Sequence, residues 1–158
     1  MKEDVKKSNL LQGGEFLIKE QPASQVFIPE EFSEEQIMIR DMAHDFIKTK
    51  IRPFVPQIDK QLEHPEMVPN LLEEAGELGL LGASLPEEYG GMGIDFNSET
   101  ILTEELGASQ SWGVAFAAHT GIGTLPIYYL GTEDQKNKYL PGLATGKIKA
   151  AYCLTEPD

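Results

Sequence analysis

The feature that most constrains the fold is a run of twenty residues, 111–130, that contains no Asp, Glu, Lys or Arg. Drawn as a helix, the run carries apolar side chains on every side, and a helix of that kind is a buried one. Gly121, Gly123 and Pro126 weaken it, so a kink is expected within it. The run therefore predicts a kinked helix at the centre of a helical bundle.

Segments on both sides of this run carry the start signals of surrounding helices. A capping box, Ser33 with Gln36, opens a helix with apolar side chains at helical spacing, which Pro53 bends or ends. Another capping box lies at 132–135. Further helices are expected at residues 69–78, 95–107 and 132–143. The prediction is an all-α fold, an antiparallel bundle of about five or six helices over residues 33–148.

Residues 1–32 are the least regular part of the chain, because Gly13, Gly14 and Pro22 interrupt them. We expect an extended arm that packs over the surface. The alternative is that its two apolar patches, 15–19 and 26–29, dock onto a neighbouring subunit or onto a domain outside this chain.

The last residues depart from the helical pattern. Residues 149–154 combine small, aromatic and branched side chains with no helical stripe, which predicts a strand. Pro157 lacks an N–H and holds Glu156 extended, so a turn should follow. A strand without a partner leaves its backbone groups unpaired. Residues 149–158 are therefore expected to open a second domain that lies outside this chain.

Composition excludes several classes of function. The formal net charge is -13, with 26 acidic and 13 basic residues, so the surface should repel nucleic acid. Cys153 is the only cysteine, which excludes an internal disulfide and permits a reducing compartment. No apolar run is long enough to span a membrane, and the first residues do not form a secretory signal. Composition thus predicts a soluble, cytoplasmic protein.

Four motifs, in order, resemble those of the acyl-CoA dehydrogenases. They are Leu-Pro-Glu-Glu-Tyr-Gly-Gly at 85–91, Glu-Glu-Leu-Gly at 104–107, Leu-Gly-Thr-Glu-Asp-Gln-Lys at 130–136 with Lys-Tyr-Leu-Pro at 138–141, and Tyr-Cys-Leu-Thr-Glu-Pro at 152–157. The resemblance covers residues 33–158 and identifies 33–148 as the amino-terminal helical domain and 149–158 as the start of the central β-domain.

The last motif implies a flavin site. In the family it contacts the flavin of FAD, which puts Tyr152, Leu154 and Thr155 in that role here. The alternative is that Tyr152 and Leu154 are ordinary β-core residues and that Thr155 begins a turn. Asp158 departs from the small residue that is common after this proline.

The central helix carries information about the substrate. Val114, Ala117 and Ala118 stand where the medium-chain type of the family has bulkier polar residues, which implies a deep apolar slot for an acyl tail. Together with Ala-His-Thr at 118–120, this resembles the long- or very-long-chain branch. The alternative is that the alanines only let helices pack closely.

The resemblance implies oxidation of a fatty acyl-CoA across its α and β carbons, with hydride transfer to flavin N5. The carboxylate base lies in the carboxy-terminal part of such enzymes, so we expect no catalytic residue in this chain, and we expect the chain alone to be inactive. The family forms dimers or tetramers and passes electrons to an electron-transferring flavoprotein. Two alternatives stay open: a non-catalytic helical module that binds a partner protein, and a family relative that oxidises a nitroalkane or an acyl-carrier thioester.

Other candidate site residues give weaker indications of function. His44, His64 and His119 lack the spacing of a metal site, and His119 is expected to be a satisfied core residue and not a catalytic one. Cys153 is expected to be a small buried group. Glu104 and Glu105 are neighbours on a helix and point about 100° apart, so they cannot act as one acid–base pair. The glycines at 90–93 and 121–123 do not follow a strand, which excludes a dinucleotide-binding motif.

Overall fold

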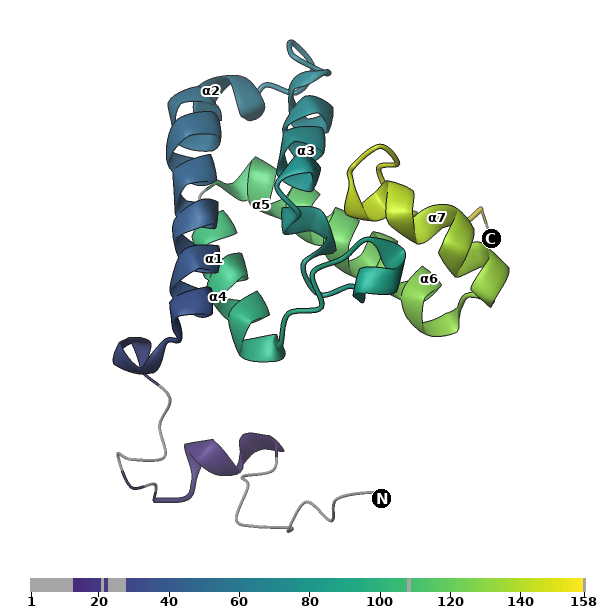
Figure 1. The fold of residues 1–158 in the computed structure, drawn as a ribbon. Helices are drawn as coiled ribbons and strands as arrows, with labels where there is room; N and C mark the ends of the chain where they lie inside the picture. The colour runs from purple at the N-terminus through teal and green to yellow at the C-terminus, as the bar shows by residue number, and fades with distance from the viewer. Residues whose placement is uncertain (1–12, 21, 23–27, 108, 158) are drawn as a thin grey trace. The chain divides into compact units, whose positions relative to one another are not determined.

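The structure is a computed structural model that describes residues 13–20, 22, 28–107 and 109–157. The chain divides into two compact units, residues 1–33 and residues 34–158, and each is described by itself (Figure 1).

In the first unit, the described residues include two short 3-10 helices, η1 (Gly13–Leu17) and η3 (Pro29–Glu31). Leu17 and Ile18, which belong to the first apolar patch of the arm, have exposed side chains. Val26 and Phe27, from the second patch, lie outside the described residues. The extended arm therefore stays a prediction.

The second unit opens with α1 (Glu34–Phe46), which continues through a π-helical turn, η4 (Ile47–Ile51). A 3-10 turn, η5 (Arg52–Phe54), and the short helix α2 (Val55–Ile58) follow. Each of these last two elements has a proline in its first turn, where a missing N–H costs no helical hydrogen bond. The helix was expected to bend or end at Pro53, and it ends at Ile51, just before the 3-10 turn that contains Pro53. The apolar stripe of this segment is buried at Ile39, Ala43, Phe46, Ile47 and Ile51.

The next two long helices lie close to the expected ranges 69–78 and 95–107. Helix α3 (Met67–Glu77) ends just before Gly79, whose φ of 79° is one that glycine adopts without strain. Helix α4 (Phe96–Leu106) is capped by Asp95, whose carboxylate accepts the N–H of Ser98 at 2.9 Å.

Helix α1 packs along α4, which the chain reaches only after α3 and a long loop (Figure 1). Gln36 Nε2 donates to Ser98 Oγ at 3.3 Å, and His44 Nδ1 lies 3.0 Å from Glu105 Oε2. The main hydrophobic core lies between α1, α3, α4 and the segment that contains Trp112, whose side chain is fully buried in it.

The run at 111–130 forms three consecutive elements. They are α5 (Gln110–Ala117), the π-helical turn η8 (Ala118–Gly123) and α6 (Leu125–Leu130). The regular helix is therefore interrupted where the kink is expected, by a π-helical turn that contains Gly121 and Gly123. Burial on all sides was wrong, because the described chain covers only one side of the run. That side holds Trp112, Phe116, His119 and Thr124, whereas Val114, Ile122, Tyr129 and Leu130 are exposed.

Helix α7 (Glu133–Ala144) begins with the predicted capping box. The N–H of Thr132 donates to Gln135 Oε1 at 2.8 Å, and the N–H of Gln135 donates to Thr132 Oγ1 at 3.3 Å. Helices α6 and α7 lie side by side (Figure 1). A second, smaller core gathers on α7 and the loop before α4, and it contains Leu85, Tyr89, Leu140, Leu143 and Ala144.

Among the described residues there are helices and loops but no strand, which confirms the all-α class. Five of the α-helices have eight residues or more, in line with the predicted number. The strand expected at 149–154 is not formed, because a strand needs a neighbouring strand for its hydrogen-bond ladder. No described helix has both the length and the apolar character that crossing a bilayer requires.

Candidate functional site

The residues expected to contact a flavin lie on an exposed segment beyond the last helix. Tyr152 is 57% exposed and Leu154 is 73% exposed, and Thr155 is exposed as well. Within 149–157 the backbone has no regular secondary structure. The three side chains therefore stand outside both hydrophobic cores of the described chain. Their roles as flavin contacts or as core residues of a following β-domain stay predictions.

Two glycines seat the start of this segment against the bundle. The N–H of Ile148 donates to Gly142 O at 2.9 Å, and a Cβ on Gly142 would lie 2.7 Å from the Ile148 side chain. A Cβ on Gly123 would lie 2.6 Å from the Cβ of Ala150. A methyl group on Gly142 would displace the Ile148 side chain, whereas one on Gly123 would push against Ala150 itself, including its backbone, so Gly123 is the position where the close approach requires glycine. Lys149 Nζ, between the two contacts, pairs with Glu73 Oε2 at 3.0 Å.

His119 joins this segment to the bundle. Its ring is buried, with Nε2 2.9 Å from Leu143 O and Nδ1 accepting the N–H of Ala150 at 3.1 Å. Burial lowers the pKa of His119, and the charge of Lys149 lowers it further, against an opposing effect of the bond to Leu143. The expectation of a satisfied core histidine is confirmed. Its contact with Ala150 could not be found from the sequence, since nothing in a pattern joins residues 31 positions apart.

The residues expected to line an acyl slot share one face of the chain. Val114, Ala117 and Ala118 follow helical spacing across α5 and the start of η8, and Val114 is 63% exposed. Ala117 is exposed and Ala118 is half-buried. Within the described chain, therefore, no helix packs over Ala117, and both the acyl slot and close helix packing stay predictions.

A cavity of about 720 Å³ lies between α4 and α6. Its walls combine apolar side chains of both helices with two carboxylates and two threonines. The lining residues are Phe96, Glu99, Thr100, Thr103, Glu104, Leu125 and Tyr129. None of the predicted cofactor or substrate residues is among them.

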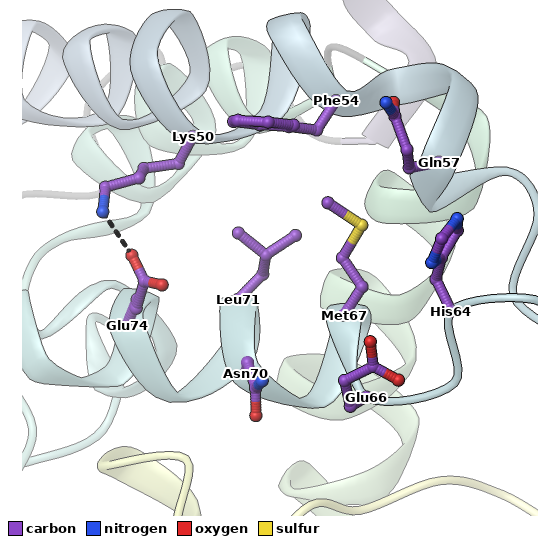
Figure 2. Close-up of a pocket in the computed structure, with 9 residues that line it drawn as sticks. All are labelled: Lys50, Phe54, Gln57, His64, Glu66, Met67, Asn70, Leu71 and Glu74. Carbon is purple, nitrogen blue, oxygen red and sulfur yellow. Dashed lines mark ion pairs between the residues drawn. The ribbon is translucent and has the colours of Figure 1, made fainter.

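A second cavity, of about 500 Å³, lies between the segment η4 to α2 and helix α3 (Figure 2). Phe54, Met67 and Leu71 form its apolar part, and Lys50 Nζ pairs with Glu74 Oε2 at 2.7 Å on one side (Figure 2). It likewise includes no residue that the sequence singled out for the cofactor or the substrate.

The structure also places the other side chains that the sequence singled out. Cys153 was expected to be buried, and this was wrong: its thiol is exposed because the segment has left the hydrophobic cores. Within the part of the chain that the structure describes, no group of three His, Cys, Asp or Glu side chains could hold a metal ion. Glu104 and Glu105 do not act as a pair, since Glu105 contacts His44 while Glu104 lines the larger cavity.

The motif at 85–91 has a structural role that the sequence did not reveal. The loop closes on itself through backbone bonds from Met92 N to Gly82 O and from Gly93 N to Leu85 O. A Cβ on Gly91 would overlap the carbonyl of Leu85. The glycines therefore build a tight loop against α7 and do not form a phosphate cradle.

Comparison with known proteins gives consistent matches. The family described as acyl-CoA dehydrogenase, N-terminal domain, matches residues 33–147. A probable acyl-CoA dehydrogenase of Bacillus subtilis is 46% identical over 153 residues, which are 96% of this chain and 25% of that protein.

Comparison with solved structures gives matches to the same family. An acyl-CoA dehydrogenase from Bacillus anthracis, complexed with FAD, has a TM-score of 0.82 and 46% identity over 94% of this chain and 25% of its own. A chain in a structure of the electron transferring flavoprotein of Acidaminococcus fermentans has a TM-score of 0.66 and 36% identity over 77% of this chain and 32% of its own. This chain thus spans about a quarter to a third of the proteins it matches.

Proposed function

Because this chain belongs to the acyl-CoA dehydrogenase family, we propose that it forms the amino-terminal part of a flavin-dependent enzyme that oxidises a fatty acyl-CoA. The observation that carries the proposal is the exposed segment with Tyr152 and Thr155, in a chain whose family match ends just before it. Residues 149–158 then open the β-domain, and residues 1–32 form an arm on the surface of the enzyme.

The side chains of the segment fit an FAD cofactor. A flavin ring needs a flat apolar surface and hydrogen bonds along its pyrimidine edge. Tyr152 offers an aromatic face, Leu154 an apolar side chain and Thr155 a hydroxyl group, and none of them has a hydrogen-bond partner within the described chain. Bound FAD supplies the hydride acceptor. The part of these residues is to hold and orient the ring.

The acyl tail would lie along the outer face of α5 and η8. Val114, Ala117 and Ala118 present small apolar side chains there, two of them exposed, and burial of each CH₂ of a tail against such a surface is worth about 0.8 kcal/mol. These three side chains are small and uncharged, so they set no early end to the slot. For this reason we assign the enzyme to the long- or very-long-chain branch.

The proposal extends to assembly and partners. The whole enzyme would form a homo-oligomer, and its electrons would pass to an electron-transferring flavoprotein, in line with the likeness to a chain in a structure of that name. Its place is the cytoplasm, where the exposed thiol of Cys153 stays reduced. The catalytic base and the rest of the flavin site come from residues outside 1–158, so the chain alone is inactive.

The test is to express the full reading frame that contains this chain and to record its absorption spectrum. A yellow protein that is bleached by a long-chain acyl-CoA without oxygen supports the proposal. A colourless protein that ignores thioesters would overturn it and favour a helical interaction module. Bleaching by a nitroalkane alone would keep the flavin and reject the acyl-CoA substrate.

A matched pair of variants tests the role of Thr155. T155A should weaken FAD binding about two- to tenfold, the effect of one lost hydrogen bond. T49A removes a threonine hydroxyl that bonds only to Asp45 O on an exposed turn, and it should leave FAD affinity unchanged. Equal affinity in T155A and T49A would remove Thr155 from the site.

A further inference from the structure

The two ring nitrogens of His119 have opposite partners, which fixes the position of the ring proton. An amide N–H can only donate, so Nδ1 accepts the hydrogen bond of Ala150, at 3.1 Å. A carbonyl oxygen can only accept, so Nε2 carries the hydrogen and donates to Leu143 O, at 2.9 Å. His119 is therefore a neutral imidazole with its proton on Nε2.

The structure holds this ring firmly in place. His119 is 1% exposed and lies in the π-helical turn η8, an element that is rare and often found at functional sites. Its backbone carbonyl accepts the hydroxyl of Thr124 at 2.7 Å, and Thr124 is also buried. Both the side chain and the backbone of His119 are thus held by contacts other than the one to Ala150.

Ala150, which donates to Nδ1 of His119, is the last described residue held by a hydrogen bond before the exposed segment. Among the residues that the structure describes, Ala150 is the last one to make a hydrogen bond, and 151–157 are all exposed. The missing side chain of Gly123 leaves the space that Ala150 occupies. At no more than about 3.6 Å per residue, Tyr152 stays within about 7 Å of this point and Thr155 within about 18 Å.

We infer that His119 is a positioning residue for the flavin site: it holds Ala150, and so sets where Tyr152, Leu154 and Thr155 stand. It acts through the backbone of Ala150 and touches neither cofactor nor substrate. The part of this inference that concerns the flavin rests on the proposed function. Lys149, the residue before Ala150, is held in an ion pair with Glu73 at 3.0 Å.

Two variants of His119 separate its two hydrogen bonds. In Asn, the oxygen bonded to Cγ takes the place of Nδ1, so H119N keeps an acceptor for Ala150 and loses the donor to Leu143. In Gln, the nitrogen two bonds from Cγ takes the place of Nε2, so H119Q keeps the donor to Leu143 and leaves the N–H of Ala150 without a partner.

The measurement is hydrogen exchange of the peptide 149–155 in the full-length protein, alongside its affinity for FAD. H119Q should exchange about tenfold faster in this peptide and bind FAD about tenfold more weakly, while the peptides of α1 and α4 stay unchanged. H119N should stay much closer to the wild type in both measurements. An unchanged peptide in H119Q, or an equal rise throughout the chain in both variants, would overturn the inference.

A second pair of variants leaves the ring intact. G123A places a methyl group against Ala150 and should reproduce the effects of H119Q on exchange and on FAD affinity. G121A, in the same turn, adds a methyl group with nothing within 4 Å and serves as its control. Equal exchange in G123A and G121A would count against the inference. If the wild type binds no FAD, the proposed function fails, and exchange of 149–155 alone decides whether His119 anchors the segment.

Discussion

The phenol of Tyr89 donates a 2.9 Å hydrogen bond to Oε2 of Glu133. The other oxygen of this carboxylate accepts Lys136 Nζ at 2.8 Å. Tyr89 belongs to the motif at 85–91 and Glu133 to the motif at 130–136, so two segments that resemble one family meet at a single carboxylate. These two motifs therefore serve the fold, by tying a loop to the first turn of α7.

This carboxylate should make part of the protein's stability sensitive to acid. The hydrogen bonds from Lys136 and then from Tyr89 lower the pKa of Glu133 below its ordinary value of 4.5. A lowered pKa means that the stabilisation is complete above the ordinary value and is lost as pH falls through the folded value. E133Q should therefore be less stable than the wild type near neutral pH, and the difference should shrink below about pH 4.5. Urea unfolding at a series of pH values measures it.

The control for this experiment is D134N, which removes a carboxylate from the same first turn of α7 without touching Tyr89 or Lys136. Its effect on stability should be smaller than that of E133Q. Equal losses in the two variants at every pH would mean that only the charge near the helix start matters, and not the hydrogen bonds.

His119 should produce a second, separate loss of stability on acidification, in a higher pH range than the loss due to Glu133. Burial lowers the pKa of this ring below 6.5, so the unfolded chain takes up a proton before the folded chain does. The stability due to neutral His119 is complete above about pH 6.5, falls as pH drops below it, and levels off below the folded pKa. H119N carries no titrating ring and should lack this step. The same pH series would contradict the prediction if both proteins lost stability in parallel between about pH 6.5 and pH 5.

Two glycines on helices should respond in opposite ways to an added methyl group. In α3, a Cβ on Gly76 would overlap the backbone carbonyl of Thr145, so G76A should cost about 1–3 kcal/mol or more of unfolding free energy. In α5, the nearest atom to a Cβ on Gly113 lies at 3.9 Å. G113A should therefore gain up to about 1 kcal/mol from helix propensity. Urea denaturation of both variants checks the signs, and a stabilising G76A would contradict the close approach of α3 and the end of α7.

Trp112 fills the main core, but burial of its indole N–H without a partner costs free energy that a phenyl ring would not cost. It is fully buried against Phe46 and Phe116, with ring centroids 5.6 and 6.0 Å away, and its Nε1 has no hydrogen-bond partner within the described chain. W112A should cost about 3–5 kcal/mol. W112F removes an unsatisfied N–H that costs about 1–3 kcal/mol, so its net loss should be well under half of that. Thermal and urea unfolding followed by circular dichroism would refute this if the two variants lost equal stability.

The acyl slot can be tested by closing it. In the full-length enzyme, A117L should lower kcat/KM for long-chain acyl-CoA about tenfold or more and leave short-chain activity nearly unchanged, since the longer side chain takes the room of the tail. K48L adds the same side chain on the exposed surface of η4 and is the control. An equal loss for long and short chains in A117L would place the tail elsewhere.

The sequence could predict what depends on local pattern. The capping box predicted at 132–135 is a single-turn feature, and the structure has it. Helices α3 and α4 also lie where the pattern predicts helices, at 69–78 and 95–107. The buried stripe of α1 also followed from its spacing, because one helix face is set by neighbours three and four residues apart.

The sequence could not predict what depends on distant partners. The two π-helical turns left no signal in the spacing, and no pattern joins His119 to Ala150 or Tyr89 to Glu133. Exposure of Val114 and Cys153 was missed for the same reason, since burial is decided by which elements pack above a residue. The positions of Tyr152, Leu154 and Thr155 as cofactor ligands came only from resemblance, and they stay a prediction.

Trp112 is the sole indole of the chain, and it sits sealed in the main core, many residues away from the exposed terminal segment. Its fluorescence therefore reports the melting of the bundle and is silent about motion after Ala150. A dye attached to the thiol of Cys153 would report the opposite. The chain thus offers two optical probes: Trp112 for unfolding of the bundle, and a dye on Cys153 for motion of the segment that follows the His119–Ala150 hydrogen bond.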